Sequence, residues 1–386
     1  MNGLLVALLL AAAPASDPRP AGDTVLVERR LAVMGTALDV AVAAADRPTG
    51  LAAAERAVAA LEEAERRLST WRDDSELAAL NQAPAGRTVE LSAELAAELA
   101  AAVRCASATG GAFDPAVGPL VEAWGLRSGG RRPDAVALAT AREAVRLSAL
   151  DLEGRRATRR HPGLTLEEGG FGKGAGLDAA VAAALTDPRV RSVRLDLGGQ
   201  VATGGAALGP LAVADPFDRR RPVLAVALDG GSLAVSGNSE RGLVLDGERL
   251  GHLLDPRSGL PAPDFGAVAV WAASALEADC LATGLYVMGP EAALSWGAAH
   301  PPVGVAVLER VGATLRVRAT AGLAARLRPL AAGVEIEIVR GETEQRAEEV
   351  VADARPTAPG TDASRRDCAG GTDPWRSICV PAFTRP

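Results

Sequence analysis

A glycine-rich run, GGFGKGAG at 169–176, is the sequence feature that most constrains the local backbone of this chain. Five glycines in eight residues let the backbone approach a ligand closely, and helical periodicity follows at 174–186. Amide groups at a helix start favour anions such as phosphate. The run also holds Lys173, the only lysine in the sequence, and lysine is a compact point charge. We interpret the run as a phosphate site, with a plain turn as the alternative; its spacing fits neither a P-loop nor a dinucleotide fingerprint.

Composition excludes some classes of protein. The 386 residues are 48% hydrophobic and 23% charged, which is typical of a globular chain. The net charge of −7 argues against sequence-independent binding of nucleic acid, which needs a basic face. We therefore expect no nucleic-acid partner.

Helices and strands are expected to alternate without a strict period. Helices are predicted over 51–68, from the N-cap Ser92 to the glycines at 110 and 111, over 174–186 and over 277–288. Strands are predicted as a pair within 26–44, broken at 34–36, then at 164–168, 191–197, 211–214, 223–228, 232–236, 243–246, 266–272 and twice within 303–319. This pattern predicts an α+β fold with mixed, partly antiparallel sheets flanked by helices.

The N-terminus has the pattern of an export signal. Residues 3–13 are apolar but too few to span a bilayer, and Ala-Pro-Ala at 13–15 offers a cleavage site. We expect a signal peptide over 1–15, a linker over 16–26 and a periplasmic protein without a lipid anchor, because no cysteine follows the apolar run. A misassigned start is the alternative.

The catalytic domain is expected over 27–335, and a variable tail over 336–386, where the composition becomes charged and turn-rich. Cys368 and Cys379 in the tail could form a disulfide in an oxidising compartment. Cys105 and Cys280 match no zinc or redox motif.

A second chemical signal is Asp279 with Thr283. At i and i+4 these side chains project from one helix face, and their oxygens suit Mg²⁺. The alternative is a capping Asp and a Thr that bonds back to its own turn.

Three weaker signals remain. His252, expected on a short strand, could act as a general base, or it could be a structural histidine. Asp255 in the following Asp-Pro turn could simply cap it. Trp71 could stack on a flat ring in a chain with only 3% aromatics, or it could be a core or hinge aromatic.

The order of the motifs resembles the FAD:protein FMN transferase (ApbE-type) family. Met-Gly-Thr at 34–36, Ser-Thr-Trp at 69–71, Gly-Ala-Phe-Asp-Pro at 111–115, the glycine-rich run, His252 with Asp255, and the Ala-Asp-Cys-Leu-Ala-Thr segment at 278–283 occur in sequence. The resemblance covers 27–330.

The resemblance implies two lobes with an FAD cleft between them. FMN would pass from FAD to a threonine hydroxyl of an acceptor protein, such as a membrane redox subunit, with release of AMP. The implied cofactor-binding residues are Met34, Trp71, Ala112, Phe113, Asp114, Glu167, Lys173 and Leu254. Mg²⁺ or another divalent cation would be held by Gly170, Asp279 and Thr283, and catalysis would involve His252, Asp255 and Lys173.

Some positions depart from the family pattern. Glu167 stands where Asp is usual, Gly172 where Ala is frequent, and Ala175 and Ser239 where aromatics are common. Two alternatives therefore stay open: an FAD pyrophosphatase giving FMN and AMP, and a non-catalytic periplasmic FAD-binding protein.

Overall fold

A long, mainly antiparallel sheet organises the protein in a computed structural model that describes residues 24–238, 242–245 and 247–341. The described part of this sheet has nine strands in the order β1-β2-β6-β7-β10-β13-β14-β15-β17, and only β15 and β17 pair in parallel. These strands are β1 (Val25–Val33), β2 (Thr36–Ala44), β6 (Val190–Leu197), β7 (Gln200–Gly205), β10 (Gly231–Gly237), β13 (Gly266–Ala272), β14 (Gly304–Val311), β15 (Thr314–Thr320) and β17 (Val334–Val339).

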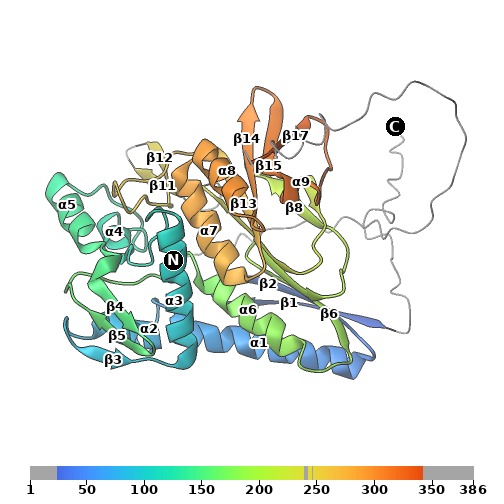
Figure 1. The fold of residues 1–386 in the computed structure, drawn as a ribbon, viewed down its shortest axis with the longest axis horizontal. Helices are drawn as coiled ribbons and strands as arrows, with labels where there is room; N and C mark the ends of the chain where they lie inside the picture. The colour runs from blue at the N-terminus through green and yellow to red at the C-terminus, as the bar shows by residue number, and fades with distance from the viewer. Residues whose placement is uncertain (1–23, 239–241, 246, 342–386) are drawn as a thin grey trace, which may run out of the picture.

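Smaller sheets and the helices complete the fold (Figure 1). The small sheets are β3 (Thr88–Glu90) with β4 (Leu150–Glu153) and β5 (Arg156–Arg159); β8 (Leu211–Asp215) with β9 (Asp218–Val226) and β16 (Leu327–Pro329); and β11 (Gly242–Leu245) with β12 (Glu248–Gly251). The helices are α1 (Arg47–Leu68), α2 (Glu76–Gln82), α3 (Ala93–Ala108), α4 (Gly118–Ala123), α5 (Ala135–Ala144), α6 (Gly172–Ala184), α7 (Ala275–Met288), α8 (Pro290–Ala299) and α9 (Ala321–Ala324), with a 3₁₀ turn at Leu147–Ala149.

The first hairpin shows how local sequence sets the chain path. β1 and β2 pair in register from Val25 opposite Ala44 to Val33 opposite Thr36. The two-residue turn between them has φ of 51° at Met34 and 68° at Gly35. Positive φ at both positions matches the twist of the paired strands, and it turns Met34 toward the helical layer.

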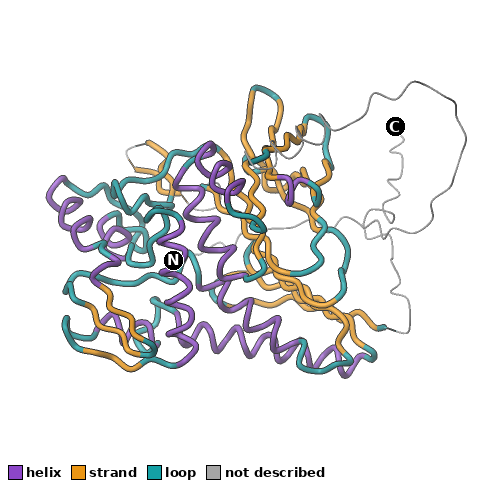
Figure 2. The backbone as a smooth tube through the Cα atoms, viewed as in Figure 1, coloured by secondary structure: helices purple, strands orange, loops and turns teal. Residues whose placement is uncertain are grey.

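The longer helices pack on one face of the sheet and contribute parts of the core. Apolar residues of α1 and α6 pack on β2 and β6, through Ala57, Leu61, Leu177 and Leu195 among others. Helices α3 and α7 form the largest cluster with β10, β13 and β14. The opposite face of β13–β15 is covered by β8, β9, β16 and α9. Figure 2 shows most helices at the left and centre of the view, with α1 running along the bottom below the strands β1, β2 and β6 of the long sheet.

The structure confirms the α+β class, with mixed and partly antiparallel sheets flanked by helices. The strand pair within 26–44 and the helix after Ser92 are confirmed; the Ser92 hydroxyl accepts from Leu95 N at 3.1 Å. Two expectations were wrong. Residues 164–168 form no strand, since only Thr165 makes an isolated bridge, with Val117. His252 lies in a bend after β12, because the strand already ends at Gly251.

The expected domain limits can be compared with the ends of the sheet. β1 begins at Val25, within the expected linker, and the boundary expected between 335 and 336 falls inside β17. The signal peptide, Cys368 and Cys379 lie outside the described residues. Among the described helices, none is both long and apolar enough to cross a membrane.

Candidate functional site

The two strongest sequence signals meet at the start of α6. Lys173 Nζ donates to Asp279 Oδ1 at 2.9 Å, and the backbone N of Gly174 donates to Asp279 Oδ2 at 3.0 Å. Asp279 is only 5% exposed, whereas Lys173 is half-buried. A buried carboxylate thus shares its charge with a lysine and with the amides of a helix N-terminus, where an anionic group is stabilised.

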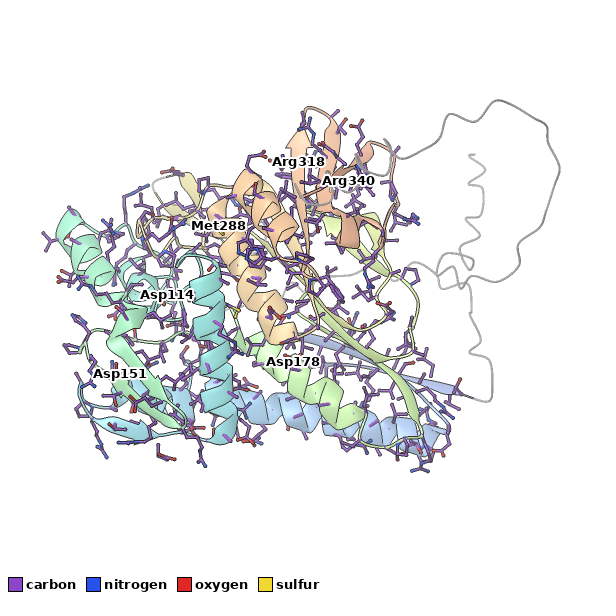
Figure 3. All side chains as sticks on the ribbon, in the orientation of Figure 1. Asp114, Asp151, Asp178, Met288, Arg318 and Arg340 are labelled. Atoms are coloured by element: carbon purple, nitrogen blue, oxygen red, sulfur yellow. The ribbon has the colours of Figure 1, made fainter. Side chains whose placement is uncertain are left out.

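A glycine makes this approach of the two helices possible. A Cβ added at Gly174 would lie 2.5 Å from Leu276 Cα, so any side chain there would collide with the backbone of α7. The Asp178 side chain then fixes the start of α7: its carboxylate accepts from Ser274 Oγ at 2.6 Å, from Ala275 N at 2.6 Å and from Leu276 N at 3.0 Å. Figure 3 labels Asp178 where α6 meets α7. The helix carrying Asp279 and Thr283 is therefore anchored to the glycine-rich run.

Gly170 and Thr283 lie beside each other. A Cβ at Gly170 would be 3.4 Å from Thr283 Oγ1 and 2.9 Å from Phe113 Cε2. The Thr283 hydroxyl makes no hydrogen bond within the described residues, so the expected alternative, a bond back to its own turn, does not form. Ser274, and not Asp279, caps α7. Both structural alternatives proposed for this pair are thus absent from the described chain.

These donors fit a hard divalent cation. Asp279 offers carboxylate oxygens, Thr283 an unengaged hydroxyl and Gly170 a backbone carbonyl. No cluster of three His, Cys, Asp or Glu side chains suited to a metal occurs in the part of the chain that the structure describes. A cation here would depend on one carboxylate and neutral oxygens, and so on ligands from substrate phosphates or water.

Met34 and Phe113 lie against the glycine-rich run, and Ala112 precedes Phe113 in the chain. The Met34 Sδ lies 3.2 Å from a Cβ added at Gly176, which places the side chain against α6. Ala112 and Phe113 are buried in the main core, and Phe113 N donates to Thr109 Oγ1 at 3.1 Å. Phe113 therefore lies between the glycine-rich run and α7.

Two nearby carboxyl groups carry raised pKa values. Burial raises the pKa of Asp114 to about 6, against the lowering effect of a hydrogen bond from Ala116 N at 2.7 Å. Burial also raises the pKa of Glu167, and the charge of Arg127 opposes this shift. Carboxyl groups whose pKa is shifted by desolvation, and which lie beside other polar residues, occur at functional sites more often than chance predicts.

Trp71 stands at the edge of the same region. It is 69% exposed, and the Arg127 guanidinium carbon lies 4.6 Å from the centre of its ring. Of the expected alternative, a core or hinge aromatic, the core position is wrong, because the ring packs on a loop arginine and not in the core. Arg127 also pairs with Glu167.

The predicted residues of segment 252–255 are mainly engaged with their own surroundings. His252 is half-buried, and Leu254 packs with Leu120, Trp124 and Ala141 in a cluster formed by α4 and α5. Asp255 is engaged within its own turn, since its carboxylate accepts from Arg257 N at 2.9 Å and from Arg257 Nε at 2.8 Å. This geometry matches the capping role that the sequence left open.

Two residues of the site, Arg127 and Asp178, have no role predicted from the sequence. Arg127 comes from a loop whose local sequence, GLRSGGRR, carries no signal of its role. Asp178 does carry one, because an acidic residue inside an otherwise apolar helix, α6, needs a partner.

Comparison with known proteins places these features in a family. The family model described as "ApbE family" matches residues 34–307. A protein of Klebsiella pneumoniae named FAD:protein FMN transferase is 31% identical over 296 residues, covering 73% of this chain and 83% of that protein. One of the same name from Treponema pallidum is 33% identical over 308 residues, covering 74% and 84%.

Solved structures agree with the sequence relatives. The flavin transferase ApbE from Vibrio cholerae superposes with a TM-score of 0.66 at 26% identity, covering 78% of this chain and 98% of that one. The ApbE protein from Thermotoga maritima gives 0.68 at 27% identity, covering 74% and 94%. The matched segment contains the Lys173–Asp279 contact and the residues around it. The chain therefore belongs to the ApbE family of FAD:protein FMN transferases.

Proposed function

We propose that this protein transfers FMN from FAD to a threonine hydroxyl of an acceptor protein, with a divalent cation such as Mg²⁺, and releases AMP. The observation that carries the proposal is the meeting of Lys173, Asp279, Thr283 and Gly170 at the N-terminus of α6. This arrangement offers what a pyrophosphate needs, namely a positive helix end, a lysine and oxygen donors for a cation.

The charges at this site determine the role that we propose for each group. In the reaction, the threonine oxygen forms a bond to the FMN phosphorus, the bond from that phosphorus to the AMP oxygen breaks, and the hydroxyl proton goes to a base. Lys173 and the α6 amides would stabilise negative charge that develops on the phosphoryl oxygens. A cation held by Asp279, Thr283 and the Gly170 carbonyl would supply further charge neutralisation at the pyrophosphate.

The remaining predicted residues bind FAD or act on the acceptor threonine in this proposal. FAD would lie between the group formed by α2–α5 and the long sheet, with the flavin toward Trp71 and with Met34 and Phe113 beside the phosphates. His252 is the candidate to accept the threonine proton, because an imidazole exchanges protons near neutral pH. Asp255 would support that segment through its turn.

The test uses the purified protein with FAD, Mg²⁺ and a small acceptor domain that carries a threonine flavinylation motif. Covalent flavin is detected by in-gel fluorescence and by the mass of the acceptor, and AMP by chromatography. We expect transfer in the wild type and its loss with Asp279→Ala or with excess EDTA. The matched control is Asp151→Ala, an acidic residue of the β4–β5 hairpin that pairs with Arg160 and is labelled in Figure 3.

Other outcomes would contradict the proposal. AMP and free FMN without an acceptor would identify a pyrophosphatase. Bound FAD without AMP, across several acceptors, would identify a binding protein. Full transfer in the presence of EDTA would exclude the cation while leaving the transfer reaction.

We also propose that the protein acts in the periplasm on a membrane redox subunit. The apolar N-terminal stretch at 3–13 supports export. Fractionation of cells that express the full chain tests this, because a cytoplasmic location with an uncut N-terminus would overturn it.

A further inference from the structure

Arg127 joins three chain segments that are distant in sequence. Its guanidinium donates to the carbonyl oxygen of Thr70 at 2.8 Å and also bonds to Thr70 Oγ1 and to Glu167 Oε2. Thr70 Oγ1 in turn bonds to Glu168. The loop after α1, the loop after α4 and the segment before α6 are thereby tied together by one side chain.

The same guanidinium covers one face of Trp71. Its carbon lies 4.6 Å from the ring centroid, within the range of a cation–π contact. Because Trp71 remains 69% exposed, most of the indole is still open to solvent and available for stacking. A large exposed aromatic that packs on a partly exposed Arg127–Glu167 ion pair is suited to binding a planar ring.

This ring is connected to the glycine-rich run. Glu168 follows Glu167 directly, and Gly172 N at the start of α6 donates to the Glu168 carbonyl at 2.6 Å. A Cβ at Gly172 would lie 3.1 Å from Glu168 Cγ. The contacts of Arg127 thus relate the orientation of Trp71 to the helix end where the phosphates are proposed to bind.

We propose that Arg127 is a positioning residue that holds Trp71 as a stacking platform for the isoalloxazine ring of FAD; this inference rests on the proposed function. Arg127 acts from the far face of the indole. Its role is to fix the ring, through Glu167 and Thr70, so that stacking does not have to order a mobile side chain on binding.

The experiment measures FAD binding by isothermal titration calorimetry in the full protein. We expect Arg127→Ala to weaken FAD binding about 2- to 10-fold, the range of a partly exposed cation–π contact. The KM for FAD should rise with it, while kcat at saturating FAD stays within about twofold, because the phosphoryl centre is untouched. Arg127→Lys should fall between, since an ammonium cannot bridge Glu167 and Thr70 as a planar fork does.

Two controls make the test specific. Arg72→Ala removes the same charge beside Trp71, but Arg72 pairs with Asp74 at 2.8 Å and not with the indole, so FAD binding should be unchanged. In a Trp71→Ala background, Arg127→Ala should have no further effect on FAD binding, which is the signature of action through Trp71. Arg127→Lys keeps the test valid if Arg127→Ala folds poorly.

Failure of this inference differs from failure of the proposed function. If the wild type transfers FMN but Arg127→Ala and Arg127→Lys bind FAD like the wild type, Arg127 does not position Trp71. The same conclusion follows if Arg127→Ala weakens binding equally with and without Trp71. If FAD binds with the expected dependence on Arg127 but no FMN is transferred, the inference stands and the transferase proposal fails.

Discussion

Lys173 and Asp279 form an ion pair of 2.9 Å between the first turn of α6 and the second turn of α7, 106 residues apart in the chain. This contact places the one lysine of the sequence on the carboxylate that is the main candidate ligand for a cation. A cation at Asp279 would repel the ammonium group and direct it toward substrate oxygens. The pair thus links cation binding to the position of Lys173.

Replacing Lys173 should affect the reaction more than substrate binding. We expect Lys173→Met to lower kcat about 10²- to 10³-fold, the usual cost of losing one donor that stabilises transition-state charge, with a smaller change in the KM for FAD. Single-turnover transfer to the acceptor measures this. Arg189→Met, which removes an exposed cation that pairs with Asp187, is the control. A raised KM for FAD with an unchanged kcat would show that Lys173 only binds substrate.

Gly174 should tolerate no side chain. Gly174→Ala places a methyl group against the backbone of Ala275 and Leu276, and overpacking against rigid backbone costs about 1–3 kcal/mol or more. Gly169→Ala in the same run meets no atom within 4 Å and should leave stability nearly unchanged. Denaturant unfolding of both variants measures the difference. Similar free energies of unfolding for the two variants would mean that α6 and α7 can move apart without a loss of stability.

The sequence predicted those elements whose signals are local. Ser92 precedes its helix as an N-cap, and the β1–β2 turn follows from Met34 and Gly35. β17 is not predicted from the sequence. It pairs in parallel with β15, from which α9 and β16 separate it in the chain, and a pairing between separated strands leaves no pattern in a short window of sequence.

The site was predictable only in part for the same reason. The order of motifs in the chain pointed to Lys173 and Asp279, but no local pattern states that they touch. The contact of Arg127 with Trp71 joins two loops whose sequences are unremarkable in isolation. Long-range packing, which no short window of sequence encodes, determines such contacts.

Asp178 should be important for stability as well as for the site. Asp178→Ala removes the acceptor for Ser274 Oγ and two backbone amides of α7, and we expect a loss of about 1–3 kcal/mol. Asp46→Ala removes one capping bond, to Thr49 N at the start of α1, and an exposed contact with Arg189, and should cost less than Asp178→Ala. Thermal and denaturant unfolding test this order, and an equal loss in both variants would contradict it.

Asp114 should make stability depend on pH in an unusual direction. Its pKa is raised to about 6 in the folded protein, from 3.8, chiefly by burial. Between these values the folded state binds more protons than the unfolded state, so the free energy of unfolding falls as pH rises through this window and is level above it. Asp114→Asn removes the titrating group and should therefore be more stable than the wild type at pH 8, with the advantage vanishing below about pH 4.

Denaturant unfolding at several pH values measures this difference. Asp196, whose pKa burial also raises to about 6, is present in both proteins and cancels in the comparison. Asp187→Asn is the control of opposite sign, because hydrogen bonds from Arg189 lower the pKa of Asp187 to about 2. That carboxylate contributes stability above the unfolded pKa and loses it as pH falls, so Asp187→Asn should be the less stable protein at pH 8. A stability difference between Asp114→Asn and the wild type that stays constant from pH 4 to 8 would mean that Asp114 titrates normally in the folded protein, and that water reaches its carboxylate.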